Sequence, residues 1–361
     1  MTPYGLAQWM SLTQSHPKAP VVQRPPAGDT QRRILRRLIS IPAVLLLTLL
    51  TTALLPALLI IALILQCLPQ YRGALRTLAF VLCYLWCETL GILASSAVWL
   101  KAIVSGRSRS NTRYLADNYR LQRWWVRTLY QAGIRLYGVR LQVSGQEALH
   151  GGAPILMPRH ASLADTLLPL VCYAIPQDVR LAYVMKRELL WDPCLDIVGH
   201  RVPNFFIDRT AEEGSTEATA MANLLRSLPA HTGLLIYPEG TRYSVERRDR
   251  ALQFASQSET ADLRQRMQNW PDLLPPRLGG PLALLGANPG RDLLFCAHLG
   301  FEGASHLRNL FSGRWTHALI QVHFWRVPYA EIPKDNKAQL NFIWSQWDQM
   351  QHEIHRLRSL R

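Results

Sequence analysis

From Leu38 to Tyr71 no residue carries a charged side chain, and this stretch constrains the fold more than any other feature of the sequence. A helix needs about 20 apolar residues to cross the hydrocarbon core of a bilayer. Residues 77–100 form a second such stretch, interrupted only by Glu88. The turn-forming residues 69–73 separate the two stretches. We therefore expect a membrane hairpin over residues 38–104.

The hairpin is expected to consist of antiparallel helices at about 38–68 and 77–100. Pro42 and Pro56 can kink the first helix, since membrane helices tolerate proline. A re-entrant hairpin that enters only one leaflet is the alternative. Both arrangements leave the rest of the chain on one side of the membrane.

Positive charge flanks the hairpin. The chain has 40 Lys and Arg against 25 Asp and Glu, a formal net charge of +15. Arginines cluster in the basic N-terminal segment 1–37 and again after residue 100, whereas the connecting loop holds only Arg72 and Arg76. By the positive-inside rule both clusters lie on the cytoplasmic side. Because this charge flanks apolar helices, it favours anionic lipid over nucleic acid.

Residues 105–138 are expected to form a basic amphipathic helix at the membrane interface. Its apolar stripe consists of Leu121, Trp125, Leu129, Ala132 and Leu136, with arginines around it. Such a helix can lie flat among the lipid headgroups. The alternative is a helix that packs on the core of the following domain and leaves its basic face in solvent.

Residues 139–361 have the pattern of an α/β domain. Residues 154–158, 180–185 and 233–237 are short, apolar and bounded by turn residues, as buried strands are. Helical patterns cover 163–175, 214–228 and 338–358, the last as a core helix. The alternation predicts helices packed on a mostly parallel sheet.

His160 and Asp165 follow the first of these strands. On a straight helix their spacing would separate the two side chains by about 140°. They can meet only if His160 is still in the loop and Asp165 is in the first turns of the helix. Asp165 would then accept from one imidazole nitrogen and leave the other as a general base. A histidine bonded to the backbone at a strand end explains His160 equally well.

Two further clusters place arginines at the ends of apolar runs. Phe206-Ile-Asp-Arg209 is one, and Glu239-Gly-Thr-Arg242 is the other. The guanidinium fork suits phosphate oxygens, and Gly240 allows close approach of a ligand to the backbone. The alternative is that Glu239 and Arg242 only pair with each other and stabilise a turn.

Together these clusters resemble the boxes of the glycerolipid acyltransferase superfamily, which includes 1-acylglycerol-3-phosphate and lysocardiolipin acyltransferases and tafazzin. The order and spacing of the boxes agree over about residues 140–330, including Val184-Met-Lys-Arg-Glu-Leu189. Two departures stand out: Arg159 precedes the histidine, and Leu274-Pro-Pro-Arg-Leu-Gly279 is closer to the lysocardiolipin branch than to the usual proline-centred box.

The resemblance implies acyl transfer from a thioester to a lysophospholipid hydroxyl, with 139–361 as the acyltransferase domain. His160 and Asp165 would be catalytic, and Lys186 a possible oxyanion or phosphate contact. The acceptor would be bound by Arg209, Glu239, Gly240, Thr241 and Arg242. We expect no metal and no cofactor; acyl-CoA or acyl carrier protein would be the co-substrate. The expected partners are membrane lipids, and a bacterial inner membrane is the expected location. The alternatives are a coenzyme-A-independent transacylase and a non-catalytic basic membrane scaffold.

Overall fold

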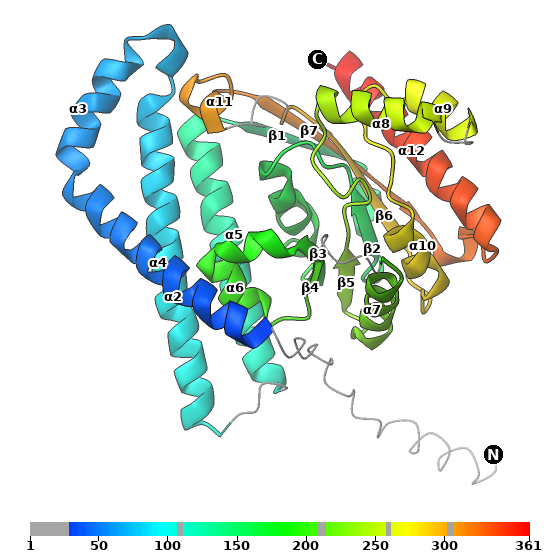
Figure 1. Ribbon diagram of the computed structural model, residues 1–361, viewed down its shortest axis with the longest axis horizontal. Helices are drawn as coiled ribbons and strands as arrows, with labels where there is room; N and C mark the ends of the chain where they lie inside the picture. Colours follow the sequence, from blue (N-terminus) through cyan, green and yellow to red (C-terminus); the bar gives the residue numbers. More distant parts are fainter. Residues whose placement is uncertain (1–28, 107–110, 208–213, 258–260, 302–306) are drawn as a thin grey trace, which may run out of the picture.

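The computed structural model describes residues 29–106, 111–207, 214–257, 261–301 and 307–361 (Figure 1). Most of the N-terminal segment 1–37 therefore lies outside the described residues. The remainder forms an α/β sandwich with a group of long apolar helices along one side of it.

A seven-stranded sheet forms the centre of the sandwich. Every neighbouring pair is parallel except β6–β7. This confirms the predicted fold class, and the three predicted strands are β2, β3 and β5. In spatial order the strands are β1 (Arg140–Ser144), β7 (Leu319–Val327), β6 (Leu293–Leu299), β2 (Ile155–Pro158), β5 (Thr232–Leu235), β3 (Arg180–Lys186) and β4 (Phe205–Ile207).

Both faces of the sheet are covered, because alternate strand residues point to opposite sides. Ile155 and Met157 of β2 pack with helices α7, α10 and α12, whereas Leu156 packs with α5 and η4. The predicted core helix near the C-terminus is α12. These covering helices are α5 (Thr112–Tyr137), η4 (Pro169–Ala174), α7 (Gly214–Ser227), α10 (Gly279–Gly286) and α12 (Asn336–Ser359).

Apart from the apolar helices that precede α5, the other helices are short or lie at the periphery. They are η1 (Pro69–Tyr71), η2 (Gln146–Leu149), η3 (Ala164–Leu167), η5 (Arg187–Trp191), α6 (Pro193–Gly199), α8 (Val245–Gln257), α9 (Ala261–Gln268), α11 (Leu307–Phe311) and η7 (Tyr329–Glu331). The helix predicted at 163–175 is not a regular α-helix: η3 is a 3₁₀ turn and η4 a π-helix. Pro169 begins η4, and the Ile175 N–H bonds to the Leu170 carbonyl five residues back.

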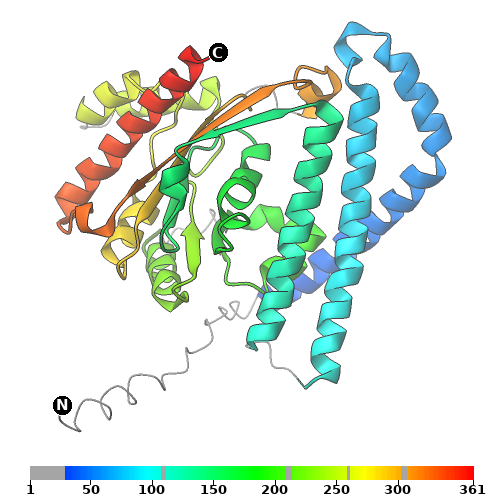
Figure 2. The same cartoon turned by 180° about the vertical axis from the view of Figure 1, so that it is seen from behind.

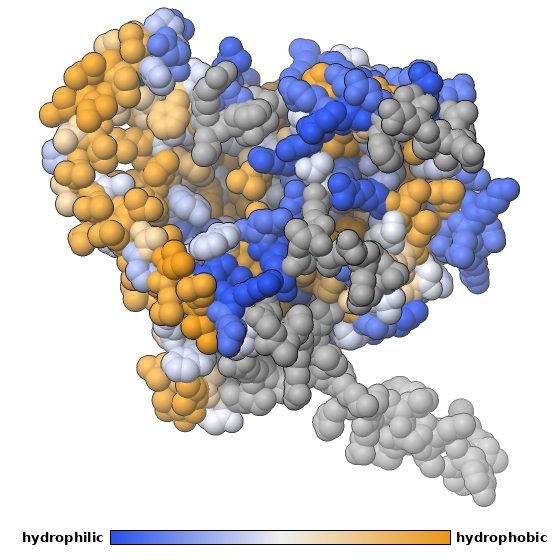
Figure 3. Space-filling model, viewed as in Figure 1, coloured by the Kyte–Doolittle hydropathy of each residue, from blue (hydrophilic) through white to orange (hydrophobic). Residues whose placement is uncertain are grey.

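The uncharged stretches form three helices: α2 (Asp29–Ala53), α3 (Leu55–Gln66) and α4 (Ala74–Val104). The chain breaks at Leu54, next to Pro56, because proline cannot supply an N–H in the middle of a helix. Pro42 lies inside α2 without ending it. Residues 30–53 and 69–104 are long and apolar enough to cross a membrane, by length and composition alone. Figure 3 shows hydrophobic surface over the side of the molecule that these helices occupy.

Helix α5 runs beside α4, as Figure 2 shows. The Nε1 atom of Trp125 donates to Glu88 Oε1 of α4 (2.6 Å), and Leu129 is buried. Trp125 and Leu129 of the predicted apolar stripe are therefore in contact with protein, as expected for the alternative in which this helix packs on the rest of the protein. Trp124 remains exposed.

Candidate active site

The boxes identified in the sequence meet at one edge of the sheet. His160 follows β2, Lys186 ends β3, and the Glu239–Arg242 box follows β5. These three strands are parallel neighbours, so their carboxyl ends lie together. The site is thus assembled by the sheet from segments up to about 80 residues apart in sequence.

His160 and Asp165 are in contact, as the sequence analysis expected. His160 lies in the loop after β2, and Asp165 lies in η3. The distance from His160 Nδ1 to Asp165 Oδ1 is 3.0 Å. An ionised carboxylate only accepts hydrogen bonds, so the hydrogen is on Nδ1 and the lone pair is on Nε2.

Asp165 is held by several donors besides His160. Its Oδ2 atom accepts from the backbone N–H groups of Ala161 (2.6 Å) and Ser162 (2.7 Å), and His298 Nε2 lies 3.4 Å from it. Burial acts to raise the pKa of Asp165. The contacts with His160 and His298 outweigh burial and hold the pKa below its ordinary value. The carboxyl group is therefore ionised at neutral pH.

The free edge of the His160 ring faces a cavity. The side chain is 12% exposed, and the ring packs on Tyr237 with centroids 4.4 Å apart. Among the described residues no hydrogen bond to Nε2 is present. This nitrogen is available to a ligand in the cavity that His160 lines.

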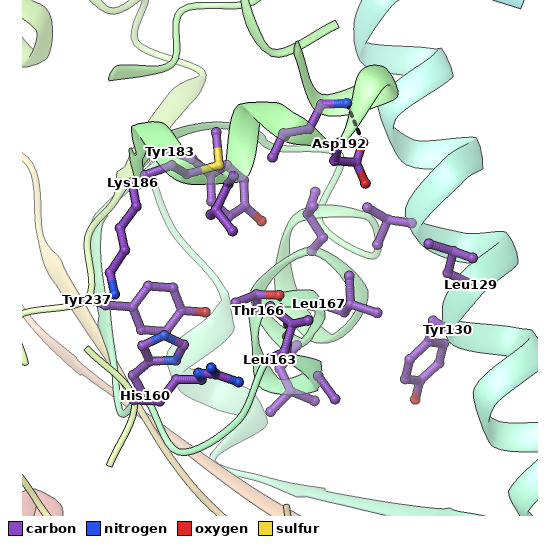
Figure 4. A pocket seen from close by; sticks show the side chains of 18 of the residues that line it. Leu129, Tyr130, His160, Leu163, Thr166, Leu167, Tyr183, Lys186, Asp192 and Tyr237 are labelled. Atoms are coloured by element: carbon purple, nitrogen blue, oxygen red, sulfur yellow. Dashed lines mark hydrogen bonds between the residues drawn. The ribbon is translucent and has the colours of Figure 1, made fainter. Parts of the chain in front are cut away.

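The cavity has a volume of about 1140 Å³ and two chemically different ends. Lys186, Arg242 and Arg277 line it near the strand ends, and many apolar side chains of α4 and α5 line it farther away; the acidic residues Glu188, Asp192 and Glu217 also belong to the lining. Figure 4 shows His160, Tyr237 and Lys186 on one side of the cavity and Leu129 and Tyr130 of α5 on the other. It can accommodate an elongated molecule with an anionic head and an apolar tail.

Only part of the Glu239–Arg242 box lines the cavity. Gly240 (φ 65°) and Arg242 line the cavity, but Glu239 and Thr241 do not. Glu239 Oε1 accepts from the backbone N–H of His160 (2.8 Å), and Oε2 accepts from that of Leu274 (3.1 Å). The buried Glu239 side chain therefore bonds to the backbone of the His160 loop, and it does not belong to the lining of the cavity. In the described part of the chain, the Glu239 oxygens bond to these backbone groups and not to Arg242, which was the alternative partner.

The electrostatics of Glu239 reflect its burial. Desolvation acts to raise the pKa of Glu239, whereas the backbone N–H groups that donate to both oxygens and the nearby Arg159 charge favour the ionised form. Of the other predicted residues, Lys186 lines the cavity, whereas Arg209 lies outside the described residues.

Three residues near the site were not assigned a role from the sequence. Arg277 lies within the 274–279 stretch and lines the cavity. Arg159, noted only as a departure from the family pattern, is buried beside the dyad. His298 gave no signal beyond being a single polar residue in the apolar strand β6. Within the described ranges, no group of three or more His, Cys, Asp or Glu residues is arranged to hold a metal ion.

Comparisons with known proteins agree with this geometry. A family model described as Acyltransferase matches residues 140–260. Lysocardiolipin acyltransferase 1 of Danio rerio is 22% identical over 290 residues, which cover 76% of this chain and 70% of that protein.

The crystal structure of the 1-acyl-sn-glycerophosphate acyltransferase PlsC from Thermotoga maritima has the same fold. The TM-score is 0.51 at 14% identity, and the match covers 79% of this chain and 97% of that one. Residues 140–260 therefore identify the protein as an acyltransferase, and the common fold and the ordered boxes around His160 support a relationship to the glycerolipid acyltransferase superfamily.

Proposed function

We propose that the protein transfers a fatty acyl group from a thioester to the free hydroxyl group of a lysophospholipid such as 1-acylglycerol-3-phosphate. The observation that carries this proposal is the His160–Asp165 contact, with the other edge of the imidazole on a cavity that is basic at one end and apolar at the other. The names of the two relatives, which specify a lysocardiolipin and an acylglycerophosphate acceptor, support the same substrate class.

In this mechanism His160 Nε2 removes the proton of the acceptor hydroxyl as its oxygen attacks the thioester carbonyl carbon. Asp165 fixes the tautomer of His160 and stabilises the imidazolium that forms. The tetrahedral intermediate then collapses: the carbon–sulfur bond breaks and the thiolate takes the proton from His160. Lys186 lines the cavity near the dyad and is a candidate to stabilise the oxyanion.

The two ends of the cavity suit the two parts of this substrate. Arg242 and Arg277 would bind the phosphate of the acceptor, since guanidinium groups match phosphate oxygens. The apolar walls from α4 and α5 would hold an acyl chain. No protein-bound acyl intermediate is required. Ser162, the nearest hydroxyl in the box, uses its Oγ to accept from the backbone N–H of Ala164 (3.2 Å).

The test is a turnover assay with purified protein in lipid nanodiscs. Lysophosphatidic acid and lysocardiolipin are each offered with acyl-CoA, acyl carrier protein thioester or intact phospholipid as donor, the last arm detecting a transacylase. His160→Ala should lower kcat about 10²- to 10⁴-fold. His150→Ala, an exposed histidine outside the cavity lining, is the matched control. Full activity of His160→Ala would refute the base assignment, and vesicle binding without turnover would favour the scaffold.

We further propose that α2, α3 and α4 anchor the protein in a membrane, with the catalytic domain on the cytoplasmic side of a bacterial inner membrane. The exposed leucines and isoleucines of these helices and the flanking arginines support this. Cys67 is exposed at the end of α3, close to the turn before α4. The Gly73 N–H, in the turn before α4, donates to the Phe311 carbonyl oxygen of the catalytic domain (2.8 Å), which supports the re-entrant arrangement over a spanning one. In a spanning hairpin a membrane-impermeant maleimide added outside the cell should label Cys67. In a re-entrant hairpin it should not, and Arg361→Cys serves as the cytoplasmic reference.

A further inference from the structure

A second histidine lies directly behind the catalytic dyad. His298 is in β6, and its side chain is fully buried. Its Nε2 atom is 3.1 Å from the backbone carbonyl oxygen of Arg159 and 3.4 Å from Asp165 Oδ2. Both of these oxygens can only accept, so the hydrogen of the His298 ring is on Nε2; it is donated to the Arg159 carbonyl oxygen, and the Asp165 carboxylate lies beside it.

The other ring nitrogen of His298 is used by nothing in the described part of the chain. Nδ1 is buried without a hydrogen-bond partner. A buried polar atom without a partner destabilises the fold, and an apolar side chain of similar size would remove that penalty. Packing alone therefore does not explain a histidine at this position, whereas an N–H that bonds to the Arg159 carbonyl and lies beside the Asp165 carboxylate does.

Arg159 fixes the His298 ring in place. Its Nη1 atom donates to the carbonyl oxygen of His298 (2.6 Å), and its Nη2 atom donates to that of Asp272 (3.0 Å). The His298 ring donates in return to the carbonyl oxygen of Arg159. This reciprocal pair joins the end of β6 to the residue immediately before His160. The departure from the family pattern at Arg159 is thus matched by a histidine on the neighbouring strand.

We propose that His298, held by Arg159, is a positioning residue for the reaction: its Nε2–H engages Asp165 Oδ2 and limits the negative charge that Asp165 presents to His160. The proposal rests on the proposed function, in which His160 is the base. On Oδ2 this N–H lies beside the backbone N–H groups of Ala161 and Ser162, and Oδ1 is left to His160. The other titratable or charged groups that the structure describes around the dyad are Tyr183, Tyr237, Glu239 and Cys296 and, lining the cavity, Lys186, Glu188, Glu217, Arg242 and Arg277.

Removing the Nε2–H group of His298 should change the pH dependence of the His160–Asp165 dyad in a predictable direction. In His298→Leu, Asp165 loses one of its donors, so more of its charge stabilises the imidazolium form of His160. The acid limb of the kcat/KM–pH profile should then move to higher pH by about 0.3–1 unit, the equivalent of one ordinary hydrogen bond. In His298→Gln the side-chain amide N–H replaces Nε2–H, and the acid limb should return toward its wild-type position.

The experiment compares both variants with wild type in kcat/KM–pH profiles and in thermal unfolding. The same proteins are titrated without substrate by following the NMR signal of the His160 ring. We expect His298→Leu to remain folded at the assay temperature and to move both pH midpoints upward. His323→Gln, on the adjacent strand β7 and in contact with Ser144 rather than with the dyad, should move neither.

Two outcomes would overturn the proposal. One is a His298→Leu variant whose pH midpoints are unchanged. The other is a loss of activity that only follows a loss of folded protein. The NMR titration needs no turnover, so the effect of His298 on the dyad can be established even if His160→Ala proves active. An active His160→Ala variant would refute the proposed function, whereas unchanged pH midpoints in His298→Leu would refute only the role of His298.

Discussion

The Glu239 carboxylate holds the His160 loop by its backbone: Glu239 Oε1 accepts a hydrogen bond from the N–H of His160 at 2.8 Å. The other oxygen accepts from the N–H of Leu274 at 3.1 Å. One buried side chain after β5 therefore joins the loop after β2 to the 274–279 stretch. The second nitrogen of the imidazole can face the cavity because its backbone is fixed in this way.

Replacing Glu239 by glutamine should disturb catalysis more than acceptor binding. Both carboxylate oxygens accept from backbone N–H groups. In Glu239→Gln the side-chain NH₂ group would replace one of these oxygens and would face a backbone N–H, so that hydrogen bond would be lost. A displacement of the loop by about 1 Å can lower turnover about 10²-fold. We expect kcat to fall by about this factor with a much smaller change in acceptor KM, measured in steady-state assays.

Glu331→Gln, an exposed substitution in η7, is the control for that measurement. If Glu239 bound the acceptor directly, the opposite pattern would appear, with acceptor KM raised and kcat preserved. That result would contradict the positioning role inferred from the two backbone hydrogen bonds.

Arg242 should contribute to binding of the acceptor phosphate. A hydrogen bond to a charged group contributes about 1.5–3 kcal/mol, so Arg242→Ala should raise the KM for lysophosphatidic acid about 10- to 100-fold. Arg242→Lys keeps the positive charge but loses the guanidinium fork, so its KM should lie between those of the wild-type protein and Arg242→Ala. Monoacylglycerol lacks the phosphate, and its KM should respond little to either variant.

Arg250→Ala is the matched control, because Arg250 is exposed on α8 and its Nε atom bonds to the carbonyl of Glu246. An equal loss of affinity for lysophosphatidic acid and monoacylglycerol in Arg242→Ala would show that Arg242 shapes the site and does not bind phosphate.

The elements that the sequence predicted correctly are those governed by local patterning. The strands at 154–158, 180–185 and 233–237 were recognisable because apolar runs between turn residues leave few alternatives. The contact between His160 and Asp165 followed from their short spacing together with a strand-to-helix boundary. The mostly parallel sheet followed from the alternation of strands and helices.

The features that sequence reasoning missed depend on contacts between distant segments. Glu239 was expected at the acceptor, because nothing local shows that its carboxylate meets the His160 backbone 79 residues away. His298 is a single polar residue in an apolar strand, and its neighbour across the sheet cannot be read from its own segment. The break of the first apolar stretch at Leu54 reflects Pro56, although Pro42 produced no such break.

Gly133 should affect the length of acyl chain that the cavity accepts. It lies on α5 and lines the cavity, and a Cβ atom added there would be 3.8 Å from Phe80 of α4, an ordinary contact. Gly133→Ala should therefore be tolerated. Gly133→Phe would occupy part of the apolar end, so its kcat/KM should shift toward shorter acyl donors in a series of chain lengths. An unchanged preference in folded Gly133→Phe would place the acyl chain elsewhere.

The first apolar helix is attached to the catalytic domain through Asp196, and this attachment should be lost in acid. Asp196 is buried in α6 and pairs with Arg36 (2.7 Å) and Arg37 (2.8 Å) of α2. Burial acts to raise the pKa of Asp196, but the bonds from His200, Arg36 and Arg37 outweigh it and lower the pKa to about 2. A carboxyl group whose pKa is lower in the folded protein than in the unfolded chain stabilises the folded protein. The full contribution is present when the pH is above the unfolded-state pKa of about 4, and it disappears as the pH falls toward 2.

The thermal midpoint of the wild-type protein in detergent should therefore fall between pH 4 and pH 2. Asp196→Asn should unfold several degrees earlier at pH 6, because it leaves the buried Arg36 without its counter-charge. At low pH the difference between the two proteins should shrink, since protonated Asp196 resembles asparagine. Asp335→Asn, at the exposed N-cap of α12, controls for loss of a carboxylate elsewhere. A difference between wild type and Asp196→Asn that stays constant from pH 6 to pH 2 would mean that Asp196 acts through packing and not through its charge.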